Sequence, residues 1–534
     1  MATHSAARWA EALGVDVTKV ASPPPIAEDE GRWRVLKRDV LRTRATDAHY
    51  STSATQQQMT EFLVRFCSEN ACDYRQGLNE LVAPFVAPAL SGAPEERYAC
   101  FAAFVLRFAG KPMVGAAGCE DQTAPIESAL FSLWRLISFH DPQLLFTLHD
   151  GACSAEMFAT PWLMTALARV MSEIPDLLRF YSAVLLEERA DPAFLFATSV
   201  ALLRMSRENL LLASPEEIPE ICCSLRAASD RVDALLKAGR EILAMTPGSL
   251  QSELRGTLDL ADRRAARVPD PHDPLCVTLT ADELLESLTS TACQFQVIEL
   301  RSEEEIAACG SGQIAHSLLL DPSILDPSES AALDAWLDLL DVGPLTLCLV
   351  DSACCAPPQT HAAKEELTKQ TIWRRLLLGI GDGEDDDDMS CRARALEKML
   401  RRRGFPRVAL LEAGGMYRII TKLGPSNLEP VVIGHEPGLW RPPRDDESVL
   451  LAAEARGHST VARILRERLN GAAPSLSPTE PSASASEVPP RAITADLASA
   501  RGHTTVASLL RRETTAGGSR ISEADLDTLQ YLAS

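Results

Sequence analysis

Residues 73–82 read DYRQGLNELV, and the pair Gln76-Gly77 stands out in a stretch that otherwise favours a helix. Glycine in a helix interior costs about 1 kcal/mol relative to alanine, so a plain buried helix disfavours this pair. We therefore expect a requirement other than helix stability at Gln76 and Gly77, and the surrounding sequence indicates what it is.

The segments on either side of this pair are helical in pattern, from about residue 31 to residue 250. In TQQQMTEFLVRFCSEN (55–70), apolar residues recur at i, i+3, i+4 and i+7, which places them on one face of a helix. Similar helical patterns follow at 127–141, 156–172, 175–187, 193–206, 215–224 and 228–243. No alternating strand pattern occurs here, so the sequence predicts an all-α domain of about eight or more helices.

From about residue 275 the pattern changes to alternating short strands and helices. Apolar runs bounded by turn signals predict buried strands at 295–300, 317–321, 345–350 and 407–412. Helical patterns lie between them, at 302–309, 329–340 and 392–405. This alternation is typical of an α/β domain with a parallel sheet. The acidic run GDGEDDDD (381–388) is interpreted as a solvated loop in that domain.

Composition and charge exclude several classes of function. Apolar residues make up 46% of the 534 residues, which is enough for several cores, and the formal net charge is −22. Such a charge argues against nucleic acid as a partner and against attachment by anionic lipid. The first residues carry no basic start followed by an apolar core, and no run is long enough to span a membrane. We therefore expect a cytoplasmic protein with peripheral membrane association at most.

The cysteines predict neither a disulfide framework nor a metal site. The 14 cysteines contain no C-x-x-C pair and no paired Cys/His spacing, and two doublets, 222–223 and 354–355, are adjacent residues. Reduced thiols in a cytosolic protein are the simplest interpretation. We expect no metal and no cofactor.

Two motifs give the helical domain a family resemblance. VLKRDVLRTR (35–44) precedes DYRQGLNELVAPFV (73–86) by some thirty residues. Together they resemble the TBC domain of Rab GTPase-activating proteins, which carry a D-x-x-R motif and then a Y-x-Q-G motif. The residues at the motif positions are Asp39, Arg42, Tyr74, Gln76 and Gly77.

The resemblance implies that Arg42 and Gln76 are catalytic fingers, inserted in trans into the nucleotide site of a GTP-bound Rab. An arginine supplies forked donors to the charge that develops on the transferred phosphoryl group. A glutamine amide can donate to phosphate and accept from water, so it can hold the attacking water in line. Asp39, Tyr74 and Gly77 are predicted as supporting residues, with Gly77 allowing a tight turn.

The chain also departs from the family pattern. Members usually begin with a further helical stretch that contains G-I-P-x-x-x-R and a tryptophan, and here the only candidates are Trp9 and Trp33. An aromatic-Asp pair that is frequent in the family is replaced by Tyr181-Ser182. From the sequence, two points therefore stay open: whether a Rab can dock, and whether its GTP hydrolysis is then stimulated.

The α/β region resembles a rhodanese-like domain. The matching residues are Glu299, Arg301, Gly312, Ile314, Gly404, Phe405, Val408, Gly414 and Gly415. Active members carry a cysteine after the central strand, in a loop of backbone N–H groups. Here that place reads DSACCAPPQT, with Asp351 near the nucleophile position, Cys354 and Cys355 displaced, and two prolines removing amide donors. We predict a degenerate loop without sulfurtransferase activity.

Beyond residue 425 the chain is rich in proline and contains two related segments. Residues 455–465 and 500–510 resemble halves of ankyrin repeats, with His458 and His503 at equivalent turns. Two such units cannot bury a solenoid core alone, because about three or more are normally needed. They are interpreted as a marginal pair or a recognition tail, split by a low-complexity linker.

The predicted organisation follows from these segments. The predicted parts are an N-terminal lead-in (1–30), a TBC domain (31–250), an inactive rhodanese-like domain (275–425), two ankyrin-like repeats (440–515) split by a disordered linker (471–490), and a tail (516–534). This order resembles the TBC domain family member 23 group, which implies vesicle transport on the trans-Golgi network or endosomes.

Two functions remain open from the sequence. The first is activation of a Rab GTPase through Arg42 and Gln76, in which the chain stimulates another protein's hydrolysis rather than acting as an enzyme in its own right. The alternative is a non-catalytic adaptor that tethers endosome-derived vesicles by binding golgins and endosomal coat proteins.

Overall fold

The computed structural model of the protein describes residues 4–16, 33–115, 123–262, 273–289, 294–325, 330–338, 345–351, 354, 392–423 and 431–433. These form two compact units, and every described element except one belongs to the first, Met1–Ser328 with Val342–Arg466. The exception is α19 (Ser330–Asp338), which lies in the second unit. The predicted ankyrin-like repeats, their linker, the tail, the acidic run and Cys355 lie outside the described residues.

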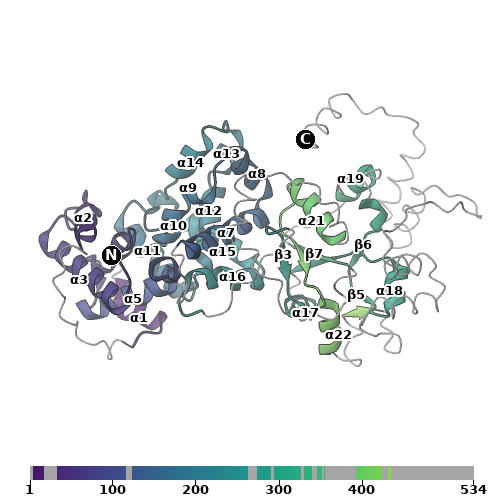
Figure 1. Ribbon diagram of the computed structural model, residues 1–534, viewed down its shortest axis with the longest axis horizontal. Coiled ribbons are helices and arrows are strands. Elements are labelled where there is room, and N and C mark those ends of the chain that lie inside the picture. Colours follow the sequence, from purple (N-terminus) through teal and green to yellow (C-terminus); the bar gives the residue numbers. More distant parts are fainter. Residues whose placement is uncertain are drawn as a thin grey trace, which may run out of the picture. The chain divides into compact units, whose positions relative to one another are not determined.

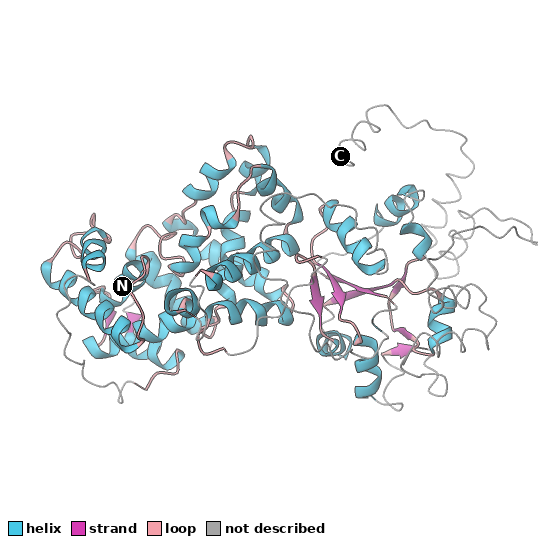
Figure 2. Cartoon of the chain, in the orientation of Figure 1, coloured by secondary structure: helices cyan, strands magenta, loops and turns pink. Residues whose placement is uncertain are grey.

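The predicted all-α region is helical, as Figures 1 and 2 show. Its first elements are α1 (Ala6–Ala12), α2 (Arg34–Arg42), α3 (Ser53–Glu69), α4 (Leu78–Val82), the 3-10 turn η2 (Ala83–Val86), α5 (Pro94–Phe108), α6 (Gly110–Val114), α7 (Ala124–His140) and α8 (Pro142–Asp150). The later ones are α9 (Ala155–Phe158), α10 (Thr160–Met164), α11 (Ile174–Ser182), the π-helical turn η3 (Ala183–Glu187), α12 (Ala193–Arg204), α13 (Arg207–Leu212), α14 (Ile218–Ser224), η4 (Ser229–Arg231), α15 (Val232–Ala244) and α16 (Gly248–Leu258).

Apolar residues decide which helices lie at the centre of this domain. α12 reads AFLFATSVALLR and is buried from Ala193 to Leu203, because it is apolar on every face. The apolar positions predicted for α3 are buried as well. Aromatic rings fill the space between α5 and α11, where Phe104 and Tyr181 have ring centroids 4.4 Å apart. The domain therefore has an extensive hydrophobic core that can hold the surface segments rigidly.

The single helix predicted over 156–172 is wrong. The chain forms the two short helices α9 and α10 and then a series of turns that contains Ala166 and Leu167 at positive φ. Pro161 stands in the first turn of α10, a position that proline tolerates because its missing N–H has no helical partner there. The turns that follow form one wall of the cavity described below.

The segment predicted as an N-terminal lead-in contributes to the core. β1 (His4–Ser5) pairs in parallel with β2 (Leu90–Ser91), so the expectation of a helical region without strands over 31–250 is wrong at β2. In α1, Trp9 is fully buried and its indole N–H donates to Ser182 Oγ at 3.2 Å. Ser182 thus connects the N-terminal helix to α11.

The predicted parallel sheet is present in the second half of the chain (Figures 1 and 2). Its strands, in spatial order, are β3 (Val277–Leu279), β8 (Val408–Leu411), β7 (Thr346–Val350), β4 (Phe295–Glu299) and β6 (Leu318–Leu319). The helices along this part of the chain are α17 (Ala281–Thr289), α18 (Glu303–Cys309), the 3-10 turn η5 (Pro322–Leu325), α21 (Arg392–Arg402) and α22 (Gly415–Leu423). A separate antiparallel pair joins β5 (Gln313–Ile314) and β9 (Val432–Ile433).

Candidate functional site

Arg42 is the last residue of α2, and its side chain faces solvent. The chain leaves the helix at Thr43, which has extended backbone angles. The Arg42 side chain is 62% exposed, and its Nη2 lies 2.7 Å from Oδ1 of Asp39, whose side chain is only 4% exposed. A buried carboxylate one turn earlier therefore holds an exposed guanidinium at the end of the helix, and the remaining N–H groups stay available to a partner.

Gln76 lies in the turn that leads into α4, and Gly77 fixes the shape of that turn. Gly77 has a φ of +114°, which side-chain-bearing residues rarely adopt. A Cβ at this position would lie 3.1 Å from Cε of Met113 and 3.4 Å from Cγ2 of Thr165. The backbone conformation thus requires glycine, the neighbours leave little room for a Cβ, and the turn leaves Gln76 exposed.

A half-buried tyrosine connects the two motifs. The Tyr74 hydroxyl donates to Oδ2 of Asp39 at 2.9 Å, and Oδ1 of Asn79 is a second acceptor 3.1 Å away. Burial, together with the hydrogen bond to Asp39, raises the pKa of Tyr74 well above its usual value. The hydroxyl therefore stays protonated and keeps donating to the carboxylate that holds Arg42.

Asn79 is a functional candidate that the motif comparison missed. Its Oδ1 accepts the backbone N–H of Gly77 at 3.0 Å, and its Nδ2 donates to Oγ1 of Thr43 at 2.7 Å. The Thr43 hydroxyl donates in turn to the backbone oxygen of Asp39 at 2.7 Å. The only signal in the sequence is a polar residue between Leu78 and Leu81 in an apolar run.

These contacts form one buried network, which we call the finger network: Asp39, Thr43, Tyr74, Gly77 and Asn79. It joins the end of α2, which carries Arg42, to the turn that carries Gln76. The structure thus brings the two predicted motifs together through their supporting residues and leaves both candidate finger side chains exposed. Buried, satisfied networks of this kind rigidify the backbone that they connect.

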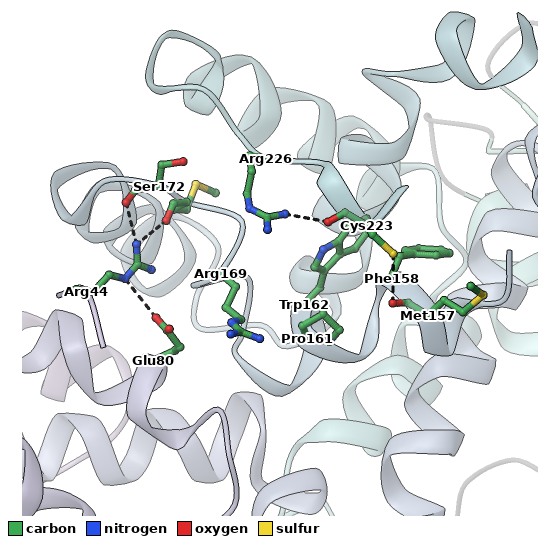
Figure 3. A pocket seen from close by; sticks show the side chains of 11 residues that line it. Arg44, Glu80, Met157, Phe158, Pro161, Trp162, Arg169, Ser172, Cys223 and Arg226 are labelled. Atoms are coloured by element: carbon green, nitrogen blue, oxygen red, sulfur yellow. Dashed lines mark hydrogen bonds and ion pairs between the residues drawn. The ribbon is translucent and has the colours of Figure 1, made fainter. Parts of the chain in front are cut away.

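A cavity of about 490 Å³ lies beside these segments (Figure 3). Arg44 lines it and donates to the backbone oxygens of Ala168, Met171 and Ser172 at 2.6 to 2.9 Å. Its Nε also lies 3.2 Å from Oε2 of Glu80, in α4. Arg44 therefore holds the turns after α10 against the two motif segments. The cavity lining does not include Arg42 or Gln76.

Cys354, the candidate nucleophile of the α/β region, is buried, unlike the exposed side chains of Arg42 and Gln76. Cys354 is 2% exposed, and its thiol lies 3.4 Å from the backbone oxygen of Leu411 and 3.8 Å from Oδ1 of Asp351. Burial and then the charge of Asp351 raise the pKa of this thiol well above its usual value. A protonated, inaccessible thiol is a poor nucleophile.

Glu299 and Arg301, two of the residues that match the rhodanese-like pattern, have a structural role. Arg301 Nε and Nη2 each lie 2.7 Å from a carboxylate oxygen of Glu299, and both side chains are fully buried. Arg301 also donates to the backbone oxygen of Gly312 at 3.1 Å. The pair therefore fixes the turn after α18 to the end of β4, and its charges are satisfied internally.

The described residues hold neither a cluster suited to a metal ion nor a helix suited to span a membrane. Within the described ranges, no cluster of three or more His, Cys, Asp or Glu side chains is arranged to hold a metal ion. Among the helices described, none is both long and apolar enough to cross a membrane.

Comparison with known proteins defines the class of the helical domain. Residues 22–211 match the family model of the Rab-GTPase-TBC domain. The predicted TBC domain is thereby confirmed, and the finger network and both candidate fingers lie inside the matched range.

Individual relatives match the chain over a similar length. The chain is 26% identical over 206 residues to the TBC domain-containing protein kinase-like protein of Gallus gallus, and 25% identical over 210 residues to the proteins of that name from Mus musculus and Homo sapiens. Each match covers 38% of this chain and 22% of the relative, so the chain spans about a fifth of the length of these curated relatives. The crystal structure of the Ypt/Rab-GAP domain of Gyp1p aligns with 44% of this chain and 78% of its own, at 15% identity and a TM-score of 0.35.

Proposed function

We propose that the protein is a GTPase-activating protein for a Rab-family GTPase and that Arg42 and Gln76 act in trans on the bound GTP. One observation carries the proposal: two exposed polar side chains of the required types stand on segments that the buried finger network joins. Exposure suits insertion into another protein, and the buried support limits the freedom lost on binding.

Arg42 stabilises the charge that develops on the transferred phosphoryl group. Hydrolysis of GTP passes through a loose transition state in which charge spreads over the phosphoryl oxygens, so positioned donors lower the barrier. The ion pair with Asp39 uses one edge of the guanidinium. The remaining N–H groups are directed at the partner, where an arginine finger contributes about 10³- to 10⁵-fold in rate.

Gln76 positions the attacking water. Its amide carries both an acceptor and donors, so the group accepts from the water and donates to a phosphoryl oxygen. Gly77 holds the turn close to the protein surface, and the hydrogen bond from its N–H to Asn79 keeps the turn in one conformation. The water is thereby presented in line with the leaving group.

The remainder of the chain is proposed to supply a membrane address. We assign the α/β region to a rhodanese-like scaffold without sulfurtransferase activity, which is supported by the buried, protonated thiol of Cys354. A site of action on Golgi or endosomal vesicles belongs to the same proposal and rests on the resemblance given above.

Phosphate release from a panel of GTP-loaded Rabs tests the proposal. At least one Rab is expected to be accelerated by the full chain, and Arg42→Ala and Gln76→Ala are each expected to remove most of the acceleration. Lys37→Ala is the matched control, because Lys37 is an exposed cation on the same helix. An absence of acceleration across the panel, or an Arg42→Ala variant as active as the wild type, would contradict it.

A non-catalytic adaptor is the second candidate function. It is favoured by an α/β region whose sheet is well formed although the thiol at its predicted site is inaccessible. An adaptor of this kind would bind golgins or endosomal coat proteins. Recovery of such partners with the Arg42→Ala/Gln76→Ala double variant, at wild-type yield, would support it, and loss of the partners in that variant would not.

A further inference from the structure

The cavity beside the finger segments is lined by several segments of the helical domain, and α9 and α10 contribute its apolar residues. Arg44 and Glu80 form one side of it, the turns after α10 contribute Arg169, and the end of α14 and the residues beyond it contribute Cys223 and Arg226. Figure 3 shows Arg169 and Arg226 between the Arg44–Glu80 pair and the ring of Trp162.

The lining carries positive charge that the chain itself does not neutralise. Glu80 is the one acidic residue in the lining, and Arg44 pairs with it. Arg169 and Arg226 are both exposed, and neither forms an ion pair with an acidic side chain among the residues that the structure describes. Arg226 Nη1 donates to the backbone oxygens of Cys223 and Leu225 at 3.2 and 2.7 Å, which leaves its other N–H groups available.

This charge is unusual for the chain, whose formal net charge is −22. Two unpaired cations on a concave wall raise the local concentration of an acidic partner and accelerate its association. The cavity is therefore suited to a negatively charged group.

The cavity is also adjacent to the proposed fingers. Arg44 follows Arg42 by two residues. Thr165 packs against Gly77, and its Oγ1 accepts the backbone N–H of Arg169 at 3.4 Å. The cavity therefore lies within reach of a GTPase that meets Arg42 and Gln76.

One side of the cavity is apolar. Phe158 and Trp162 are buried and lie at a ring-centroid distance of 5.1 Å, and Met157 is 50% exposed at the edge. Aromatic and methionine side chains with arginine are the residue types that protein interfaces favour. The combination selects an occupant that carries an acidic and an apolar side chain close together.

We propose that this cavity is a second docking point for the Rab and receives an acidic residue with an apolar neighbour, from a segment of the GTPase close to its nucleotide site. The inference rests on the proposed function and adds the residues that select the partner. Arg169 and Arg226 are specificity residues that bind the GTPase and do not touch the GTP. A folded partner is favoured over a small anion, because both guanidinium groups are exposed at the wall rather than enclosed around one site.

Charge reversal separates docking from catalysis. Arg169→Glu, Arg226→Glu and the double variant are compared with the wild type on the Rab that the panel identifies. The double variant is expected to raise KM about tenfold, because a charge at an interface acts mainly on association, while kcat stays within about twofold. Lys237→Glu on α15 is the matched control, since it makes the same charge change outside the cavity lining.

Two further measurements identify the occupant. Lys substitutions of the acidic residues around the nucleotide site of the Rab are expected to include one that restores a low KM with the double variant. Raising the salt concentration is expected to weaken the wild type more than the Arg169→Gln/Arg226→Gln variant. An unchanged KM in the double reversal variant, or a fall in kcat at constant KM, overturns the inference.

The outcomes also distinguish this inference from the proposed function. If the wild type accelerates a Rab and the reversal variants behave like it, only the docking inference fails. If the wild type binds a GTP-loaded Rab in calorimetry without accelerating it, and the reversal variants lose that binding, only the catalytic proposal fails. If the wild type binds no GTP-loaded Rab, both the catalytic proposal and the docking inference fail. Loss of binding to phosphoinositide-containing vesicles, with KM unchanged, would assign the cavity to a lipid headgroup instead.

Discussion

Arg42 and Cys354 are the candidate reactive groups of the two halves of the chain, and each has a buried aspartate beside it. Asp39 lies under an exposed guanidinium, pairs with it and is held from the other side by Tyr74. Asp351 lies beside a buried thiol, where its charge disfavours the thiolate. A buried carboxylate therefore supports an exposed cation in one domain, and another buried carboxylate suppresses a nucleophile in the other.

The environment of a candidate residue therefore decides its chemistry more than the type of residue does. A reactive group must be reachable, and its charged form must be favoured by its neighbours. Arg42 meets both requirements and Cys354 meets neither.

Removing the Arg42 guanidinium is expected to have the largest effect, a loss of the stimulated GTP hydrolysis. Arg42→Ala should lower the rate at which this protein stimulates GTP hydrolysis by the Rab about 10³-fold or more, because the transition-state charge loses its donor. Arg42→Lys should recover only a small part of that rate, since an ammonium cannot reproduce the forked donors. Single-turnover phosphate release measures both, and a fully active lysine variant would exclude a forked contact.

Thiol alkylation tests the other half of the comparison. Cys223 is exposed and Cys354 is buried, so iodoacetamide should modify Cys223 about 10²-fold faster in the folded protein. Mass spectrometry of the digested protein gives both rates from one sample. Equal rates in the native protein, with both thiols modified alike after denaturation, would show that Cys354 is accessible.

The finger network is expected to act on catalysis through position alone. Asn79→Ala removes the acceptor of the Gly77 N–H and the donor to Thr43, so kcat should fall roughly tenfold with little change in KM. Asn79→Asp keeps the acceptor and should retain more of the rate. A change in KM alone would place Asn79 in binding rather than in positioning of the fingers.

Burial without a compensating charge also governs a histidine of the helical domain. Burial, with the positive charges of Arg204 and Arg407, lowers the pKa of His140 from 6.5 to about 3. The unfolded chain therefore binds a proton that the folded chain does not, and the free energy of unfolding should fall by about 1.4 kcal/mol per pH unit below 6.5. Urea unfolding at several pH values measures this slope.

Substitution of the histidine supplies the control for that slope. His140→Gln keeps a polar side chain near Thr246 Oγ1, to which His140 Nε2 is hydrogen-bonded at 2.8 Å, and it removes the titration. Its stability should depend less on pH between 6.5 and 4. An unchanged slope would assign the pH dependence to other groups.

The sequence predicted the elements whose pattern is local. Helix α3 and the four apolar runs that form β4, β6, β7 and β8 follow from periodicity and turn signals. β3 was missed because VTL is too short to show a pattern. The two motifs pointed to Arg42 and Gln76 because their residue types and order are specific.

The rest depends on contacts between distant segments. Asn79 interacts with Thr43, and Ser182 with Trp9, and neither pair leaves a periodic trace in the sequence. The turns that follow α10, where the predicted helix ends, are held by Arg44, whose guanidinium donates to carbonyl oxygens 124 to 128 residues away. Pairings of this kind become visible only when the chain is folded.

The central claim is that Arg42 and Gln76 complete the catalytic site of a GTPase. Fluoroaluminate with GDP mimics the transferred phosphoryl group, and a partner that supplies transition-state contacts binds that state more tightly than the GTP-bound state. The wild-type chain should bind its Rab more tightly with GDP and fluoroaluminate than with GTP, and Arg42→Ala and Gln76→Ala should lose that gain in affinity. A complex of equal stability in the Arg42→Ala variant would contradict the account.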